Sequence, residues 1–363
     1  MMTAVNLRES AEFDAILPAW KRLADHSLAP AGLNAPELIL PLLRRLPGAA
    51  LATVKQGNDL LFALPVKKRR IFPALLTNWI TPLTVIGEPH LDREFPEAAL
   101  TTFINQLAHP LLLQGVPVDA PFWNCLQKQD CHGSLLGMWN RAALRPSGAY
   151  EAWLESNIGP KRRREYRRLT TRLSELGKLE FSSLATGTDN FPWAVELLAL
   201  EASGWKGKRG TAMAVSPPVE SAYIEACKFL GAAGKLRFWK LAFNRKPIAI
   251  MHAIVEGNQA WLGKIAYDEC YAKYSPGVLL ILHATEKLFA ETGITLVDSC
   301  AIPGHPMMEH VWRDRIAVAD VIIAPKSMDA KRFARTVAAE KLRRAVRRIA
   351  RDIYYHLRGM KRS

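Results

Sequence analysis

The order of apolar and polar residues in the second half of the chain predicts a run of neighbouring strands. Apolar and polar residues alternate in the segments 235–243, 248–256 and 259–266, as expected for strands that bury one face. Short turns separate them, at residues 244–247 and at Gly257 and Asn258. Turns of this length join antiparallel neighbours, so the three segments are predicted to form an antiparallel meander.

Helices and further strands are predicted on both sides of this meander. A strand at 178–184 and helices at 189–203 and 216–230 precede it, and an apolar helix, a strand at 294–297 and a strand at 318–324 follow it. Between the two preceding helices lies the glycine- and lysine-rich tract GWKGKRGTAMAVSPP, which is predicted to be a mobile or cleft-lining loop. Trp205, Lys206 and Lys208 in this tract are candidates to contact a donor or an acceptor.

The first half of the chain mixes the same two periodicities without a phosphate-cradling glycine pattern or a catalytic cluster. Its prolines at Pro73, Pro82 and Pro89 favour loops and sheet edges. The predicted elements are a helix at 8–28, a hairpin of 49–55 and 60–67, helices at 97–108 and 119–128, and strands at 111–114 and 134–139.

The apolar helix after residue 275 begins with features of an anion site. Ser275 is predicted to cap it, Pro276 takes the first helical position, and Gly277 leaves room above the first turn. A helix start has unpaired N–H groups and a partial positive charge, so the site suits a pyrophosphate. An ordinary crossover helix that begins with proline is the alternative.

The chain carries a formal net charge of +15, and most of it lies in two segments. Residues 331–362 hold twelve Lys/Arg and two acidic residues, and residues 161–172 hold seven and one. The body between them is near neutral, so the charge indicates association through two basic helices. The helix at 161–172 is expected to bind an anion or to be a solvated face.

The C-terminal segment 326–363 is predicted to be a basic amphipathic helix. Its apolar residues recur every three to five positions, from Phe333 to Leu357, and arginine or lysine fills most other positions. Such a helix can pack on the body, lie on an anionic membrane or bind nucleic acid, and packing is the first expectation.

Length and cysteine content narrow the class of protein. At 363 residues, two domains are expected. Five cysteines without a C-x-x-C pair favour a reducing compartment over a disulfide framework or a zinc ribbon. The first residues have no apolar signal core, and no run approaches the roughly twenty apolar residues of a membrane span. A cytoplasmic protein is expected, with peripheral binding to the inner face of the membrane as an alternative.

The predicted element order resembles the GNAT acyltransferase fold, and three segments resemble its BioF2-like branch, which includes the CelD-like group linked to cellulose or exopolysaccharide biosynthesis. These segments are GPKRRREYRRLTTRLSELG, LEASGWKGKRGTAM and KIAYDECYAKYSPGVLLILHATEKL; NWITPLTVIGEPHLD resembles the leading region of the same proteins. The resemblance implies an α/β (α+β) fold of two GNAT-like halves, each a mixed, mostly antiparallel sheet flanked by helices. We expect a degenerate N-terminal half at 1–146, an acetyltransferase domain at 147–325 and the tail helix at 326–363.

One segment departs from the family pattern. The usual pyrophosphate loop has an Arg or Gln, two residues, a Gly, one residue and then Gly or Ala, whereas this chain has YAKYSPGVL. Pro276 removes one donor, and Lys273 is expected to supply charge instead. Lys273, Tyr274, Ser275, Gly277 and Val278 are therefore the residues expected to bind the donor.

The resemblance implies direct attack of an acceptor on an acyl thioester, with acetyl-CoA or another acyl-CoA as donor and no metal. Backbone N–H groups of strand 259–266 would hold the oxyanion, and Lys264 is a candidate positive partner there. Asp298 and His305 are candidates for acid–base roles, and Tyr267 for protonating the leaving thiolate. Each has a structural alternative: an outward lysine, a turn-capping carboxylate, a loop histidine and a packing aromatic. Cys300 as a nucleophile is the less expected alternative, because a buried, unreactive cysteine is the commoner case. A zinc site at His305, Glu309 and His310 is rejected.

Three functions are therefore open. The first is an acyl-CoA-dependent acyltransferase that acts on an amine, hydroxyl or saccharide acceptor in exopolysaccharide or cell-envelope metabolism. The second follows from the likeness to Fem aminoacyltransferases, which use aminoacyl-tRNA as donor and also carry two GNAT-like halves. The third is a non-enzymatic accessory of a polysaccharide synthase, in which the tail helix makes the membrane or protein contact.

Overall fold

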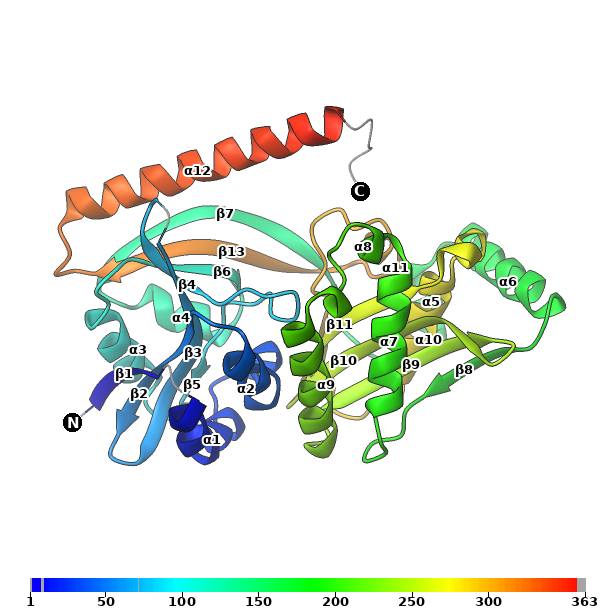
Figure 1. The fold of residues 1–363 in the computed structure, drawn as a ribbon, viewed down its shortest axis with the longest axis horizontal. Coiled ribbons are helices and arrows are strands. Elements are labelled where there is room, and N and C mark those ends of the chain that lie inside the picture. The colour runs from blue at the N-terminus through cyan, green and yellow to red at the C-terminus, as the bar shows by residue number, and fades with distance from the viewer. Residues whose placement is uncertain (1, 8–9, 71, 358–363) are drawn as a thin grey trace. The chain divides into compact units, whose positions relative to one another are not determined.

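The computed structural model describes residues 2–7, 10–70 and 72–357. The chain divides into two compact units (Figure 1). The first comprises Met1–Pro36, Pro47–Asn140 and Ala317–Ser363, and the second comprises Glu37–Leu46 and Arg141–Ile316. The segments of the two units alternate along the chain. The boundaries expected at residues 146 and 325 instead divide the chain into consecutive segments.

The first unit is built on a mostly antiparallel sheet with the strand order β1-β2-β3-β4-β6-β13-β7, and β5 pairs with β3. Only the β4 and β6 pairing is parallel among the registers described. Helices α3 and α4 pack on a core in which the rings of Phe62 and Phe103 stack at 4.2 Å. The elements are β1 (Met2–Leu7), α1 (Ser10–Asp25), β2 (Ala49–Gln56), β3 (Asp59–Arg69), β4 (Leu75–Asn78), β5 (His90–Leu91), α3 (Pro96–Asn105), β6 (Leu111–Pro117), α4 (Pro121–Gln127), β7 (Cys131–Leu144), β13 (Asp314–Pro325) and α12 (Ala330–Leu357).

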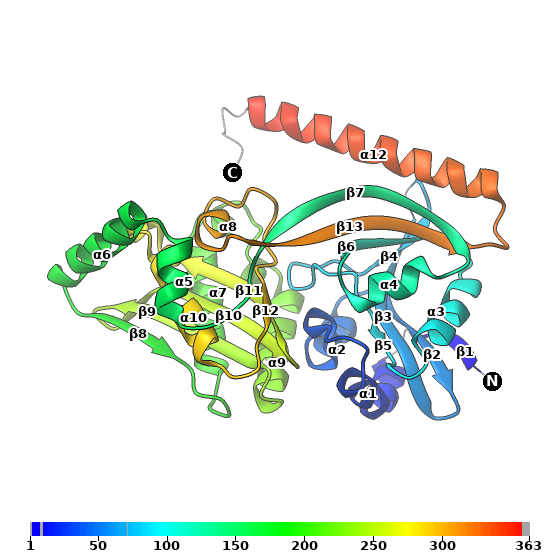
Figure 2. The same cartoon turned by 180° about the vertical axis from the view of Figure 1, so that it is seen from behind.

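The second unit has the strand order β7-β12-β11-β10-β9-β8. Its pairs are antiparallel except that between β11 and β12. Helices α7 and α9 cover one face of the sheet, and α5 and α10 cover the other (Figures 1 and 2). The elements are α2 (Pro36–Arg45), α5 (Tyr150–Asn157), α6 (Pro160–Glu175), β8 (Leu179–Ser183), α7 (Phe191–Ser203), α8 (Trp205–Lys208), α9 (Pro217–Ala232), β9 (Leu236–Phe243), β10 (Lys246–Glu256), β11 (Gln259–Tyr267), α10 (Pro276–Ala290), β12 (Leu296–Asp298) and α11 (Met308–Val311).

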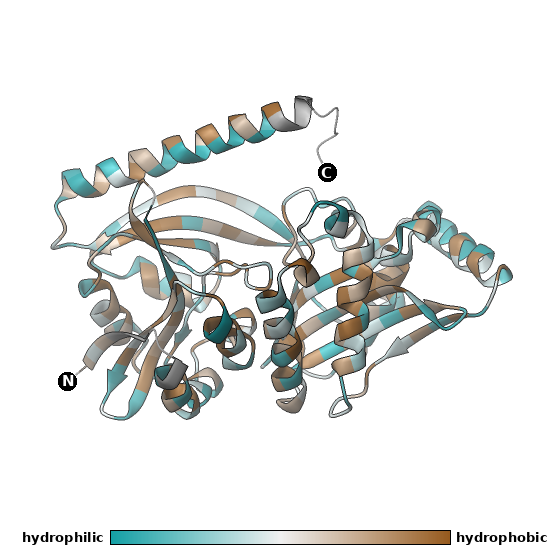
Figure 3. Ribbon diagram, viewed as in Figure 1, coloured by the Kyte–Doolittle hydropathy of each residue, from teal (hydrophilic) through white to brown (hydrophobic). Residues whose placement is uncertain are grey.

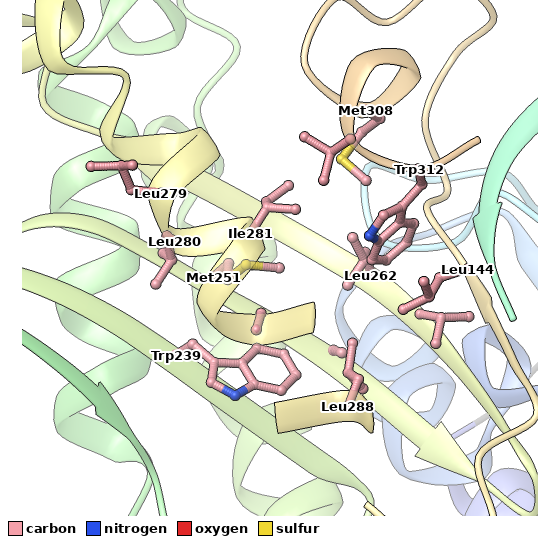
Figure 4. Packing of buried hydrophobic residues seen from close by; sticks show 14 of the residues in the cluster. Leu144, Trp239, Met251, Leu262, Leu279, Leu280, Ile281, Leu288, Met308 and Trp312 are labelled. Atoms are coloured by element: carbon pink, nitrogen blue, oxygen red, sulfur yellow. The ribbon is translucent and has the colours of Figure 1, made fainter. Parts of the chain in front are cut away.

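The core beneath α10 holds this second sheet together. Trp239 and Met251 from the meander pack against Leu280 and Leu288 of the helix (Figure 4). Trp312 closes the cluster, and its indole N–H donates a hydrogen bond to Oγ1 of Thr285 at 3.0 Å. Burial of these large apolar side chains fixes the orientation of α10, and so the position of its N-terminus, relative to β11.

The predicted fold class is confirmed: both halves have a mixed, mostly antiparallel sheet flanked by helices. The meander, the 49–67 hairpin and the helix after residue 275 lie where their patterns place them. The tract after Gly204 is not a featureless loop, because it contains α8 and a short 3-10 helix at Met213–Val215. The pattern missed β1, α2, β4 and β5, most of which are too short to show a clear period.

Candidate active site

The strands β11 and β12 separate within the second unit. Their parallel register runs from Gln259↔Leu296 to Trp261↔Asp298 and ends there. β11 continues to Tyr267, so its last six residues have no β12 partner in the described chain. A strand end that extends beyond its neighbour leaves backbone groups and side chains accessible to a ligand.

A small cavity of about 40 Å³ lies at this end of β11. The strand contributes Ile265, Ala266 and Tyr267, and the junction of α7 and α8 contributes its polar side chains. The lining residues are Leu200, Glu201, Gly204, Trp205, Lys206, Ile265, Ala266, Tyr267 and Glu269. Tyr267, a predicted site residue, thus lines the same cavity as Glu201 and Lys206 of the α7–α8 junction.

Glu201 and Lys206 form the ion pair of this junction. The carboxylate of Glu201 is 4% exposed, and it accepts hydrogen bonds from Nζ of Lys206 at 2.8 Å and from the backbone N–H of Met213 at 2.9 Å. Gly207 permits the tight turn, because a Cβ there would lie 1.7 Å from the carbonyl oxygen of Ala202. The tract predicted to be mobile is thus held to α7.

Lys264 is half-buried on β11 next to this ion pair. Burial lowers the pKa of the Lys264 ammonium, the charge of Lys206 lowers it further, and Glu201 acts in the opposite direction. A lysine in this setting holds its proton less tightly than a surface lysine. Lys264 is thus partly buried rather than fully exposed, and its role as a positive partner stays a prediction.

His252 of β10 supports the backbone beneath Lys264. The pairing of β10 with β11 shifts register between Met251 and Ala253, and Nε2 of His252 accepts a hydrogen bond from the Lys264 N–H at 3.1 Å. Burial, followed by the Lys264 charge, lowers the pKa of His252 to about 3. The ring is therefore neutral near pH 7, and it occupies one backbone donor that was expected to serve an oxyanion.

The start of α10 differs from the predicted pyrophosphate cradle. Ser275 has left-handed backbone angles (φ 51°, ψ 47°), and its side chain makes no capping hydrogen bond. Its carbonyl accepts the N–H groups of Val278 at 2.9 Å and Leu279 at 3.1 Å, while Pro276 has no N–H. In the described chain, the first turn therefore offers a ligand only the Gly277 N–H.

The room predicted above Gly277 is filled. A Cβ at this position would lie 3.2 Å from Sδ of Met307, 3.5 Å from Cδ1 of Tyr267 and 3.8 Å from Cδ1 of Ile265. Met307 follows β12 by nine residues, and its flexible thioether covers the helix start. A pyrophosphate would have to displace this side chain, so the donor residues fit acyl-CoA only after a local rearrangement.

Lys273 and Tyr274 lie in the 3-10 helix Glu269–Tyr274 that leads into α10. Nζ of Lys273 lies 5.0 Å from the centroid of the Tyr274 ring, which is a cation–π contact. Tyr267 at the end of β11 is 37% exposed. Of the residues expected to bind the donor, Gly277 lies close to Tyr267, and the backbone N–H groups of Ser275, Val278 and the following Leu279 are occupied.

Asp298 belongs to a buried ion pair. Its Oδ2 accepts from Nη1 of Arg141 on β7 at 2.8 Å, both side chains are 4% exposed, and its Oδ1 accepts the Cys300 N–H at 2.7 Å. Both carboxylate oxygens of Asp298 are thus engaged in contacts within the protein. The geometry favours a structural role for Asp298.

His305 lies in the loop after β12 and is half-buried. Its Nδ1 faces the Met308 N–H at 3.4 Å, which favours a neutral ring protonated at Nε2. The pKa of His305 is lowered, chiefly by burial and also by the charge of Lys206. A hydrogen bond with its own backbone and the charge of Glu309 act in the opposite direction. The acid–base role of His305 stays a prediction. No group of three His, Cys, Asp or Glu side chains in the described chain is placed to hold a metal ion.

The structure thus brings Tyr267 close to Gly277, and it places Lys264 with Glu201 and His252, two residues that were not predicted as site residues. In the sequence, Glu201 is one polar residue in a predicted helix that is otherwise mostly apolar, and His252 is one residue of a predicted strand. The pairing of a buried acid with Lys206 five residues later was the one sequence signal for Glu201.

Comparison with known proteins identifies the class of domain. Residues 160–304 match the family model for the acetyltransferase (GNAT) domain. This match contains the whole cluster around Lys264 and supports a transferase. No curated protein matches the chain.

Solved structures share the fold over most of the chain. The C-terminal domain of a protein assigned as a lysylphosphatidylglycerol synthetase from Agrobacterium fabrum aligns with a TM-score of 0.56 and 12% identity, over 92% of this chain and 97% of that one. L-PGS from Bacillus licheniformis gives 0.53 and 12%, over 91% and 96%. FemX gives 0.52 and 10%, over 89% and 97%. Identities this low show the fold alone, and the BioF2-like and CelD-like assignment stays a prediction.

Proposed function

We propose that the second unit transfers an acyl group from an activated donor directly to an amine or hydroxyl acceptor, at the exposed end of β11. The observation that carries the proposal is the half-buried Lys264 beside the Glu201–Lys206 pair, inside the segment that matches the acetyltransferase domain. Direct transfer is favoured by hydrogen-bond donors or a positive group at the developing oxyanion, and Lys264 is the candidate that we propose for this role.

The reaction forms one bond to the acyl carbon and breaks another. The lone pair of the acceptor attacks the donor carbonyl carbon, and the negative charge on the carbonyl oxygen is held by the Lys264 ammonium. His305 Nε2–H is a second donor toward this charge. The intermediate then expels the thiolate or ribose oxygen of the donor, which takes up the proton that the acceptor loses. Tyr267, at the rim of the cavity, is the candidate to pass that proton.

The first candidate donor is an acyl-CoA, as the domain match suggests. Its pyrophosphate would bind at the Gly277 N–H and near Lys273, and Met307 would have to move aside. Met307 therefore controls access to the helix start in this proposal. The acceptor is an amine, hydroxyl or saccharide group, with exopolysaccharide or cell-envelope metabolism as the proposed setting.

The second candidate donor is an aminoacyl-tRNA, and a groove beside α6 favours it. The groove has a volume of about 540 Å³, and Arg163, Arg167, Tyr166 and Phe181 are among the residues that line it. Cations interleaved with aromatic rings suit the unpaired 3′ end of a tRNA, because bases stack on the rings and phosphates pair with the guanidinium groups. Two of the solved structures that share the fold are named as a lysylphosphatidylglycerol synthetase and as FemX.

Calorimetric titration separates the two donors. If the donor is acyl-CoA, acetyl-CoA or octanoyl-CoA binds the wild-type protein, and Met307→Ala binds either several-fold more tightly because the helix start is open. If it is aminoacyl-tRNA, charged tRNA binds with a steep dependence on salt, and Arg163→Gln with Arg167→Gln weakens it. Binding of neither donor class to any variant would remove the proposal.

A further inference from the structure

Helix α12 packs on the first unit through one face of its N-terminal half. Phe333 and Val337 are buried against Leu75, Leu112 and Ile322 of the sheet. One turn further, Glu340 is fully buried and pairs with Arg69 of β3, Arg343 and Arg344, and Arg344 also reaches Asp320 of β13. These contacts confirm that the helix docks on the body.

A second apolar face of the same helix lies in solvent. Leu342, Val346, Ile349 and Ile353 are 64%, 56%, 58% and 53% exposed. At about 100° per residue, they fall within one narrow sector that points almost directly away from the sector of Phe333, Val337 and Glu340. We call these four residues the outer stripe. Figure 3 shows hydrophobic and hydrophilic residues mixed along α12.

Cations share the sector of the outer stripe. Lys331 and Arg335 are exposed there, on the turns N-terminal to Leu342. Further exposed cations of the helix lie on its remaining faces, roughly 110–170° from the centre of the stripe, and they include Lys341, Arg347, Arg348 and Arg351. Four large aliphatic side chains exposed on one helix face are unfavourable unless something covers them. The spacing of four, three and four residues also suits a helical partner. A second copy of this chain would, however, bring two strongly cationic helices together.

We propose that the outer stripe of α12 docks the protein on an anionic lipid surface. The aliphatic side chains enter the boundary between headgroups and acyl chains, Lys331 and Arg335 in the same sector bind the phosphates, and the other cations of α12 attract the helix to the anionic surface. This inference is independent of the acyl-transfer proposal, because no residue of the second unit takes part in it.

Vesicle flotation with the full chain tests the proposal. The protein is expected to float with vesicles of phosphatidylcholine and phosphatidylglycerol, to bind pure phosphatidylcholine vesicles at least tenfold more weakly, and to release from the mixed vesicles as salt rises. The double variant Leu342→Asn, Ile349→Asn is expected to bind the mixed vesicles at least tenfold more weakly.

The matched control is Leu176→Asn, because Leu176 is equally exposed, at 62%, but lies at the end of the other basic helix, α6. The control is expected to bind like the wild type, which separates the outer stripe from charge on α6. Circular dichroism and the thermal midpoint show that each variant is folded. Unchanged vesicle binding by the double variant overturns the proposal. So does a wild-type dimer in sedimentation that the double variant dissociates, because the stripe would then belong to a second copy.

Discussion

The imidazole ring of His252 occupies the space that a side chain at residue 263 would need. A Cβ on Gly263 would lie 2.0 Å from Cε1 and 2.5 Å from Nδ1 and Nε2 of the ring. The two residues face each other where the register of β10 and β11 shifts. At this point the ring also accepts a hydrogen bond from the Lys264 N–H. The glycine and the histidine together set the local backbone of β11 that carries Lys264.

Replacing Gly263 with alanine is therefore expected to push the ring away and break its hydrogen bond to Lys264. The expected loss in the free energy of unfolding is about 2–3 kcal/mol, from overpacking and one lost buried hydrogen bond. Urea unfolding measures it. Gly137→Ala is the matched control, because nothing lies within 4 Å of a Cβ there and the residue is also in a strand. Equal stability of the two variants would show that the ring can move freely.

The buried His252 also predicts a dependence of stability on pH. Its pKa falls from 6.5 in the unfolded chain to about 3 in the fold, so the ring contributes full stability above pH 6.5. That contribution is lost as the pH falls toward 3, because residue 252 binds a proton in the unfolded chain but stays neutral in the folded chain. Between pH 7 and pH 4.5 the loss is about 2–3 kcal/mol. His252→Gln should lose that much less over the same range, and parallel curves for the two proteins would contradict the assignment.

The charges around Lys264 predict shifts of the pH–rate profile in opposite directions. If the ammonium of Lys264 holds the oxyanion, turnover falls as the pH rises through its lowered pKa. Removing the repulsion with Lys206→Met raises this pKa and moves the alkaline limb to higher pH. Removing the attraction with Glu201→Gln moves the limb to lower pH. Limbs that stay in place in both variants would show that another group limits the rate.

The ion pair of Asp298 and Arg141 predicts a loss of stability rather than of chemistry. Asp298→Asn keeps the shape of the side chain but leaves the buried guanidinium without its carboxylate. The expected cost is about 3 kcal/mol of unfolding free energy, with turnover per folded molecule little changed. A folded variant with strongly reduced turnover would restore the catalytic role predicted from the sequence.

The docked half of α12 depends on Glu340. Burial alone would raise the pKa of this carboxyl, but hydrogen bonds from Arg343, Arg69 and Arg344 lower it to about 2. Glu340→Gln removes the charge that neutralises three partly exposed guanidinium groups, and about 2–3 kcal/mol of docking energy should be lost. Limited trypsin digestion should then cut α12 after its lysines and arginines, while Glu165→Gln, in an exposed pair of α6, should leave it intact.

The strands and helices could be predicted because their periods are local. The meander from Leu236 to Tyr267 alternates as a half-buried sheet must, and Pro276 lies at the first helical position of α10. The contacts that decide the chemistry were not predictable from such patterns. Met307 covers Gly277 from thirty residues away, and Arg141 meets Asp298 from 157 residues away. Lys264 could be predicted as a candidate because a lysine is unusual in an apolar strand. Its neighbours Glu201 and Lys206 could not be predicted, because they come from a helix junction whose geometry depends on the folded chain.

If Lys264 holds the oxyanion in acyl transfer, its replacement must reduce turnover more than the replacement of a lysine outside the site. Release of thiol from acyl-CoA, or of uncharged tRNA from aminoacyl-tRNA, would be measured with a metabolite extract as the source of acceptors. Lys264→Met is compared with Lys246→Met, which removes an exposed lysine at the start of the neighbouring strand β10. The account predicts a loss of at least a hundredfold, about 3 kcal/mol of transition-state stabilisation, for Lys264→Met alone. Wild-type turnover in Lys264→Met, or no release by the wild type from either donor, would contradict it.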